Sequence, residues 1–436
     1  MGASLDRFRK QIASRQARVA VVGLGYVGLP LAMAFFRKGF TVLGIEKDRE
    51  RLARLKKGES YITDVACREL RGALARGRLI PHSDFSALKN ADAVIICVPT
   101  PLKRKYHPDI SFIKEAVKQI SRNLRKGSLV VLESTTFPGT TDEVILPILE
   151  SGGLRHGEDF HLCFSPERID PGNAKYPVWR IPKVIGGASP EAALMAKALY
   201  DIVVDKVVLV SSARVAEITK LLENTFRIVN IGLIDEIAMM AHRMNIDIWE
   251  VIRAASTKPF GFMPFYPGPG VGGHCIPKDP LYLYWKAKKF GFKSRFIKLA
   301  SDVISSMPEY VVRRVEAELK KAGGSLKASK VLVCGVTYKK DVKDLRKSPG
   351  LDIIDILQRD NVKVAYYDPF IPYLKFPHLS LNSVFLSPKA LNNFDCVIIA
   401  TDHSKVDYGL ILKNSRLIFD ARNVYKGKQD RKVVRL

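Results

Sequence analysis

The sequence predicts an α/β fold in which two doubly wound domains are joined by a long central helical region. Three observations predict it. Strand-sized apolar runs alternate with helical patterns over residues 17–210, a long helical pattern follows over residues 216–246, and a second, shorter set of strand-sized runs fills residues 326–436. Buried strands that alternate with helices are typical of parallel βαβ units with helices on both faces of the sheet.

The first domain is predicted over residues 17–210, after a leader helix. Residues 1–16 are basic and amphipathic but lack the apolar core of a signal peptide, so we expect a leader helix in the cytoplasm. A helix is expected from the glycine cluster after the first strand through Lys38. The expected strands are 17–24, 41–46, 92–99, 128–134, 161–167 and 183–187.

The remaining elements form a central region at 211–325 and a last domain at 326–436. The long helix is apolar on more than one side, which favours packing between domains or against a second subunit. A Gly/Pro-rich stretch, 258–280, is expected to be irregular backbone. The last domain is expected to contain strands at 329–338, 361–369, 396–403 and 416–423.

Composition restricts the classes of function. Hydrophobic residues make up 47% and charged residues 26% of the 436 residues, and no apolar run approaches the roughly 20 residues of a membrane span. The six scattered cysteines form no CxxC pair, which favours reduced thiols in the cytoplasm, and we expect no metal site. The net charge of +26 is compatible with nucleic acid, but its even spread along the chain favours attraction of an anionic substrate and cofactor.

A dinucleotide site is predicted after the first strand. Gly23, Gly25 and Gly28 fit the GxGxxG pattern, whose glycines provide the tight turn, the close approach to a pyrophosphate and the contact between helix and strand. Glu46 closes the second strand, where a carboxylate accepts from the ribose hydroxyls and repels a 2′-phosphate. The pattern therefore predicts a Rossmann-like domain that binds NAD rather than NADP, and both doubly wound domains are expected to be Rossmann-like.

Two segments are candidates for catalysis. Lys220 and Asn224 share one face of the long helix, although a solvated polar stripe is the usual reason for such a pair. Cys275 follows several glycines in the loop 268–280, where the cations Lys220 or Lys278 would favour its thiolate. Turn chemistry alone could also explain this loop. Asp279 could orient water or hold Lys220, and His274 is interpreted as structural because adjacent side chains usually point apart.

Five segments together resemble the UDP-glucose/GDP-mannose dehydrogenase family, in order from about residue 17 to residue 425. The segments are GLGYVGLP (23–30), SPER (165–168), TKLLENTFR (219–227), PGPGVGGHCIPKDP (267–280) and YKKDVKDLRKSP (338–349).

The resemblance implies a four-electron oxidation of a sugar CH2OH to a carboxylate, with two NAD per sugar. Cys275 would add to the intermediate aldehyde and carry the thioester that water hydrolyses. Lys220 and Asn224 would stabilise the developing oxyanion. Asp279 would assist proton transfer or activate water, and Glu167 would help the hydrolytic step. Animal members have a second glutamate where this chain has Pro171, so Glu167 and Asp279 must divide the task differently.

The resemblance also implies two sets of binding residues. The cofactor contacts, beyond the three glycines and Glu46, are Tyr26, Val27, Arg51, Thr100, Thr135, Lys278 and Arg346. The C-terminal domain would bind the UDP-sugar, with Lys339 at the nucleotide half. The expected substrate contacts are Glu167, Arg168, Lys220, Asn224, Phe265, Tyr266, Gly268, Gly272, Lys339 and Arg422.

The substrate is left open among three UDP-sugars. The loop 257–283 is most similar to UDP-N-acetylglucosamine 6-dehydrogenases, with UDP-N-acetylmannosamine enzymes as neighbours and UDP-glucose as the alternative. Such an enzyme would make a precursor for a polysaccharide or glycan and would form a homodimer through the long helix, without nucleic acid or membrane as a partner. Two other hypotheses are a two-electron dehydrogenase of the 6-phosphogluconate type and a catalytically silent nucleotide-binding or nucleic-acid-associated module.

Overall fold

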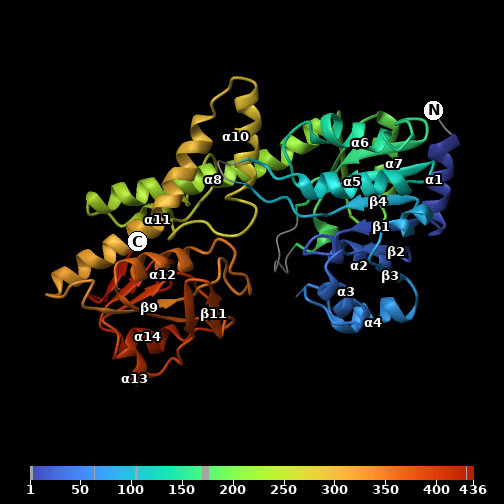
Figure 1. The fold of residues 1–436 in the computed structure, drawn as a ribbon. Helices are drawn as coiled ribbons and strands as arrows, with labels where there is room; N and C mark the ends of the chain where they lie inside the picture. Colours follow the sequence, from blue (N-terminus) through green and yellow to red (C-terminus); the bar gives the residue numbers. More distant parts are fainter. Residues whose placement is uncertain (1–2, 63, 104–106, 169–175, 429) are drawn as a thin grey trace. The chain divides into compact units, whose positions relative to one another are not determined.

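The computed structural model describes residues 3–436 apart from 63, 104–106, 169–175 and 429 (Figure 1). The chain forms two compact units. The first comprises Met1–Glu223 and Trp285–Phe292, and the second comprises Asn224–Tyr284 and Lys293–Leu436. Pro171, the position of the absent second glutamate, lies outside the described residues.

The first unit is built on an eight-stranded sheet with the order β3-β2-β1-β4-β5-β6-β7-β8. Its strands are β1 Arg18–Val22, β2 Thr41–Ile45, β3 Leu79–His82, β4 Ala93–Ile96, β5 Ser128–Leu132, β6 Phe160–Phe164, β7 Lys183–Gly187 and β8 Val207–Val210. All six predicted strands are present. The edge strands β3 and β8 were not predicted, because β3 is short and contains a proline and β8 is half-exposed.

One pair of strands departs from the expected parallel arrangement. Strands β6 and β7 are antiparallel, with Cys163 opposite Gly187 and Phe164 opposite Gly186. A parallel connection needs a crossover of a dozen or more residues, usually a helix. Among the described residues between these strands the only helical turn is the 3-10 helix η4 (Val178–Arg180).

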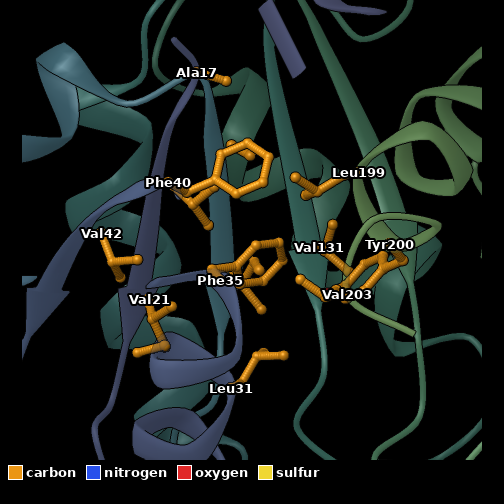
Figure 2. Close-up of a cluster of buried hydrophobic side chains, with 14 of the residues drawn as sticks. Ala17, Val21, Leu31, Phe35, Phe40, Val42, Val131, Leu199, Tyr200 and Val203 are labelled. Carbon is orange, nitrogen blue, oxygen red and sulfur yellow. The ribbon is translucent and has the colours of Figure 1, made fainter. Parts of the chain in front are cut away.

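Helices cover both faces of this sheet (Figure 1). They are α1 Ala3–Ala13, α2 Gly28–Arg37, α3 Arg49–Lys56, α4 Cys67–Ala75, η1 Ser86–Asn90, α5 Ser111–Asn123, η3 Thr141–Ile145, α6 Leu146–Glu150, η4 and α7 Pro190–Tyr200. Alternate residues of β1 enter different cores, Val19 and Val21 on one face and Ala20 and Val22 on the other. Figure 2 shows the first of these cores, and Phe8 of α1 belongs to it.

Helix α8 (Ala213–Arg243) is 31 residues long and confirms the predicted central helix. It is followed by α9 (Ile248–Ala255), and α10 and α11 cover Asp279–Lys289 and Arg295–Lys321. Residues 258–278 contain neither helix nor strand, as the Gly/Pro content predicted. None of the helices in the described part of the chain is long and apolar enough to cross a membrane.

The second unit contains a five-stranded parallel sheet with the order β10-β9-β13-β14-β15. Its strands are β9 Lys330–Cys334, β10 Lys363–Tyr367, β13 Cys396–Ile399, β14 Ile418–Asp420 and β15 Val433–Arg435, with the hairpin β11 Tyr373–Phe376 and β12 Leu379–Asn382 beside them. Its helices are α12 Pro349–Arg359, α13 Pro388–Leu391 and α14 Tyr408–Asn414. The four predicted strands are present, and the short, partly exposed β11, β12 and β15 were not predicted. The predicted fold class is confirmed.

Candidate active site

The glycine turn after β1 leaves room at one of its three glycines. A Cβ on Gly23, where φ is +90°, would lie 2.7 Å from the carbonyl oxygen of Cys97, and a Cβ on Gly28 would lie 1.9 Å from that of Gly23. Nothing lies within 4 Å of a Cβ position on Gly25. Gly23 and Gly28 are therefore required by the packing of the chain itself, while Gly25 leaves a backbone surface that a pyrophosphate can approach.

The carboxylate at the end of β2 is fixed against this turn. Glu46 is buried, and its Oε2 accepts from the Leu24 N–H at 3.1 Å while its Oε1 accepts from the Asp48 N–H at 3.0 Å. The Arg51 guanidinium lies 5.7 Å from the centre of the Tyr61 ring, next to the same segment. The negative charge of Glu46 lies where the ribose of a dinucleotide is bound in this fold.

Further predicted cofactor residues lie at the same edge of the sheet. Thr100 follows β4 and Thr135 follows β5, so both lie beyond the carboxyl ends of central strands. Tyr26 is exposed within the glycine turn, and Val27 is half-buried. The strand order reverses between β1 and β4, and ligands of open α/β sheets bind at such a switch point. These residues fit an NAD site.

Two predicted substrate or catalytic residues of the first unit lie near α8. Lys220 is 8% exposed, whereas the neighbouring Leu222 is 62% exposed, so the polar side chain is buried and the apolar one is not. This reversal argues against a solvated stripe. Arg168 is paired with Glu223, with Nη2 and Oε1 2.7 Å apart, and also donates to the Pro182 carbonyl at 2.8 Å. The described contacts of Arg168 are therefore with the protein itself.

In the second unit the predicted nucleophile lies on a turn that leads into α10. The Cys275 carbonyl accepts from the N–H groups of Lys278 at 3.1 Å and Asp279 at 2.8 Å, and the Cys275 side chain is exposed. Asp279 and Asn224 are both buried, and the Asn224 amide donates to Asp279 Oδ2 at 2.7 Å. The structure thus brings Asn224 and Asp279 into direct contact, one turn of backbone from the cysteine.

The charges around Cys275 identify its nearby cation. Lys278 Nζ lies 3.2 Å from His274 Nδ1. Burial, together with the charges of Lys278 and Arg346, lowers the pKa of His274 to about 4, so the imidazole is neutral at neutral pH. Burial also lowers the pKa of Lys278, while Asp279 and Cys275 raise it. A cysteine–imidazolium pair with His274 is excluded by this neutrality, and Lys278 is the cation that favours a thiolate.

The glycines before Cys275 are packed against the chain itself. A Cβ on Gly272 would lie 2.5 Å from the Lys347 carbonyl oxygen, and one on Gly273 would lie 2.7 Å from the Tyr338 ring. The Gly273 N–H donates to the Arg346 carbonyl at 2.9 Å. These glycines therefore let two predicted motifs, 267–280 and 338–349, pack closely together.

Gly268 lies between the carboxyl group of Asp235 and the guanidinium group of Arg422. Its N–H donates to Asp235 Oδ1 of α8 at 3.0 Å, and a Cβ on it would lie 2.8 Å from Arg422 Nη1. Arg422 Nε also donates to the Ala400 carbonyl at 2.8 Å. Burial raises the pKa of Asp235 to about 8, against the lowering effects of the Gly268 N–H and Arg422. The predicted substrate residues Gly268 and Arg422 lie next to each other, and no motif in the sequence predicted that Asp235 of α8 would bind this loop.

A buried histidine fixes the loop that carries Lys339. His403 Nδ1 accepts from the Asp341 N–H at 2.9 Å, so the ring proton lies on Nε2, which is 3.1 Å from Asp368 Oδ2 and 3.0 Å from Thr337 Oγ1. Thr337 also donates to the Lys339 carbonyl at 3.0 Å. His403 was not predicted. Its position shortly after the apolar strand β13 (Cys396–Ile399) is a sequence feature that could have indicated a buried polar residue at the edge of the sheet.

The other predicted contacts of the second unit lie in two places. The Phe265 ring is 5.8 Å from Phe226 of α8, and the exposed Tyr266 stacks on Trp249 of α9 with ring centres 6.2 Å apart. Arg346 pairs with Asp344, with Nη2 and Oδ2 2.6 Å apart. The predicted catalytic set is divided between the units: Lys220 and Glu167 belong to the first, and Asn224, Cys275 and Asp279 to the second.

The dinucleotide-binding edge of the first unit is typical of a dehydrogenase, and the second unit contains an exposed cysteine beside a buried Asn–Asp pair. Comparison with known proteins identifies the family. Its NAD binding domain matches residues 17–204, its central domain residues 214–304 and its UDP binding domain residues 332–427. The chain belongs to the UDP-glucose/GDP-mannose dehydrogenase family, and it is an NAD-dependent oxidoreductase.

Individual relatives cover nearly the whole chain. A UDP-N-acetyl-D-mannosamine dehydrogenase of Pyrococcus horikoshii is 36% identical over 416 residues, which is 94% of this chain and 96% of the relative. A UDP-N-acetyl-D-glucosamine 6-dehydrogenase of Pseudomonas aeruginosa is 37% identical over 393 residues, 90% of this chain and 92% of the relative. The solved structure of a UDP-D-ManNAc dehydrogenase from Pyrococcus horikoshii superposes with a TM-score of 0.87 at 34% identity, covering 96% of this chain and 98% of that one.

Proposed function

We propose that the chain oxidises C6 of a UDP-N-acetylhexosamine, UDP-GlcNAc or UDP-ManNAc, to the uronate through a thioester on Cys275, as a step in polysaccharide or glycan precursor synthesis. The observation that carries the proposal is the exposed Cys275 on the turn into α10, beside the Asn224–Asp279 pair and the cation Lys278. The names of the relatives support the class of sugar. UDP-glucose with the same chemistry is the alternative. We also propose the domain boundaries 17–210, 211–325 and 326–436, and the cytoplasmic location stays a prediction.

The proposed reaction has three stages. NAD held at the glycine turn would supply the hydride acceptor for both oxidations. The C6 alcohol first loses its hydroxyl proton and a hydride to become an aldehyde, and the Cys275 thiolate adds to that carbonyl carbon to give a thiohemiacetal. Loss of the second hydride leaves a thioester, and water adds to it, the C–S bond breaks and the Cys275 thiolate is restored.

Each remaining residue has a proposed task. The buried Lys220 supplies positive charge and Asn224 supplies an amide donor to the oxyanion that develops at C6. Since Asp279 accepts from the Asn224 amide, it fixes the orientation of that amide as well as assisting proton transfer. Glu167 accepts the proton of the hydrolytic water. Lys339, Arg422 and the backbone at 264–268 bind the substrate.

The test is to incubate the protein with NAD and each of UDP-GlcNAc, UDP-ManNAc and UDP-glucose, and to follow NADH absorbance together with the acid product. The proposal predicts two NADH per sugar consumed, with the highest kcat/KM for an N-acetylhexosamine. A ratio of one would end the thioester route. A preference for UDP-glucose would retain the chemistry and correct the substrate.

We further propose that the chain forms a homodimer through α8. Within the second unit the α8 residues Phe226, Leu233 and Met240 are each at least 46% exposed, and their spacing of seven residues places them along one side of the helix. An exposed apolar stripe of this length favours burial against an equivalent surface of a second copy. Light scattering at micromolar concentration should give a dimer, and Leu233→Glu should give a monomer; a monomeric unmodified chain would contradict the proposal.

A further inference from the structure

Four polar side chains gather inside the first unit, beyond the carboxyl ends of β5 and β6. Glu133 directly follows β5, Glu167 lies three residues beyond β6, Lys183 is the first residue of β7, and Tyr200 is the last residue of α7. The antiparallel register of β6 and β7, continued past the last paired residues, places Glu167 opposite Lys183. Strand pairing therefore fixes the neighbourhood of this cluster independently of its charges.

One ammonium group is shared by two carboxylates. Lys183 Nζ lies 2.7 Å from Glu133 Oε2 and 3.7 Å from Glu167 Oε2. The Tyr200 hydroxyl donates to Glu133 Oε1, and Lys183 Nζ lies 5.2 Å from the centre of the Tyr200 ring. Both oxygens of Glu133 thus have partners inside the protein, while Glu167 is the outer member of the cluster.

The exposure of the side chains increases from Glu133 to Lys183 to Glu167. The side chains of Glu133 and Lys183 are 0% and 9% exposed, and that of Glu167 is 12% exposed. Desolvation costs several kcal/mol per buried ion and offsets most of the attraction within such a pair. Net stability is therefore a poor account of Lys183 and Glu133, and the accessible third member indicates a different role.

The titration behaviour agrees with a fixed cation. The groups that face Lys183 are Glu133, Glu167, Tyr200 and Cys97. Burial alone would lower the pKa of Lys183, but Glu133 and Glu167 raise it, and the net direction is upward. Burial raises the pKa of Glu133 to about 7. Glu133 is therefore the group of the cluster that gains or loses a proton near neutral pH, while Lys183 keeps its charge.

We propose that Lys183, held in place by Glu133 and Tyr200, is a positioning residue that orients Glu167 as the base for thioester hydrolysis. The inference rests on the proposed function. In that step the water oxygen bonds to the thioester carbon, its proton passes to a Glu167 oxygen, and the C–S bond breaks to release the Cys275 thiolate. The Lys183 ammonium group, 3.7 Å from Glu167 Oε2, holds this oxygen in place to accept the proton.

The experiment compares Lys183→Met with Lys206→Met, an exposed lysine whose carbonyl accepts from the Lys183 N–H. In Lys183→Met we expect a normal rapid release of two NADH per subunit, then a steady-state rate lowered by roughly a hundredfold, the loss of one base catalyst. The Cys275 adduct should accumulate in intact-protein mass spectra, and the acid limb of the rate profile should move to higher pH. Lys206→Met should behave like the unmodified chain.

Two further variants keep the proposal open to refutation. Lys183→Arg keeps the cation and should restore most of the hydrolysis rate. The double variant Glu133→Gln with Lys183→Met removes both charges of the buried pair. If Lys183→Met alone fails to fold, the double variant is used for the same measurements. A folded Lys183→Met or double variant with unchanged hydrolysis, adduct level and pH profile would overturn the positioning role. An unmodified chain that yields one NADH per sugar would instead refute the proposed function.

Discussion

The two large sheets of this chain carry the same junction after their first strand but use it for different purposes. Gly23 and Gly335 both have positive φ, +90° and +87°. A Cβ on Gly28 would lie 1.9 Å from the Gly23 carbonyl oxygen, and one on Gly350 would lie 2.6 Å from the Gly335 carbonyl oxygen. The first junction is short, whereas the second contains residues 336–349, which include the motif 338–349.

The acid at the end of the next strand shows the same parallel and the decisive difference. Glu46 Oε2 accepts from the Leu24 N–H, and Asp368 Oδ2 accepts from the Val336 N–H at 2.8 Å. In the second sheet, however, the buried His403 donates to Asp368, and both side chains are fully buried. A glycine turn and an acid therefore do not define a dinucleotide site by themselves. Asp368 is bound to His403 inside the protein, and residues 336–349 are available to bind another ligand.

The largest effect is expected from adding a side chain at Gly28 in the first junction or at Gly350 in the second. Gly28→Val should reduce NAD affinity by more than about a hundredfold, because overpacking against Gly23 costs about 3 kcal/mol and displaces the turn. Gly350→Val should destabilise the second unit comparably and leave NAD affinity unchanged. Calorimetric titration with NAD and denaturant unfolding would measure both effects.

Gly25→Ala is the matched control for this comparison. No protein atom opposes its Cβ, so stability should be unchanged while NAD affinity falls. Normal NAD binding by a folded Gly28→Val protein would show that the first junction is not the cofactor site.

Substitutions of Glu46 and Asp368 should differ in the same way, with a smaller effect on NAD affinity. Glu46→Ala should weaken NAD binding about tenfold to a hundredfold, since a lost hydrogen-bond partner costs about 1–3 kcal/mol. Asp368→Ala should leave NAD affinity unchanged and cost about 3 kcal/mol of stability, because His403 and the Val336 N–H lose their acceptor. Glu46→Gln keeps an acceptor and should fall between, with reduced discrimination against NADP. Equal losses of NAD affinity in both alanine variants would remove the distinction between the sheets.

His403 tests the other half of the comparison. His403→Leu removes the acceptor for the Asp341 N–H and frees the loop that carries Lys339. We expect the KM for the UDP-sugar to rise about tenfold, equivalent to one hydrogen bond to a charged or buried group, with little change in kcat or in NAD affinity. Steady-state kinetics measure the split. A fall in kcat with an unchanged KM would place His403 in the chemistry instead.

The smallest effect concerns acid. His161 is the second residue of β6 and is buried. Among the described residues, neither of its ring nitrogens has a hydrogen-bond partner. Burial lowers its pKa, so the unfolded chain binds a proton near pH 6.5 that the folded chain does not, and stability is lost as pH falls through 6.5. In the second unit the lowered pKa of His274 has the same effect, and the lowered pKa of Asp368 adds a loss of stability as pH falls below its ordinary 3.8.

The measurement is the free energy of unfolding of the first unit with and without His161→Leu, at pH 7 and pH 5. The first unit of the variant should lose less stability than that of the unmodified chain as pH falls, and the second unit should lose the same amount in both proteins. A constant difference between the two proteins would show that His161 titrates normally in the folded state.

The sequence was informative where a single physical pattern decided the outcome. Apolar runs predicted the central strands of both sheets, and helical periodicity predicted α8. The short edge strands β3, β8 and β15 were missed because partly exposed segments bury too little apolar surface to give a pattern. The antiparallel β6–β7 pair was missed because local alternation carries no information on strand direction.

The candidate site was predicted mainly through motifs, and its supporting residues were not. Lys220 and Asn224 alone were indistinguishable from a solvated stripe, and only their burial argues otherwise. Glu133 and Lys183 lie at the ends of apolar runs, where polar residues usually mark the end of a strand. Asp235 and His403 act by contacts across long sequence separations, which no local pattern reveals.

The most direct test of the thioester route is to mix Glu167→Gln with NAD and UDP-N-acetylglucosamine or UDP-N-acetylmannosamine, and to digest and weigh the protein. The account predicts two NADH per subunit in the first turnover and a sugar-nucleotide adduct on the peptide that contains Cys275, with no adduct in Cys275→Ser. Full turnover to the uronate by Cys275→Ser, with two NADH per sugar and no covalent species in either variant, would contradict it.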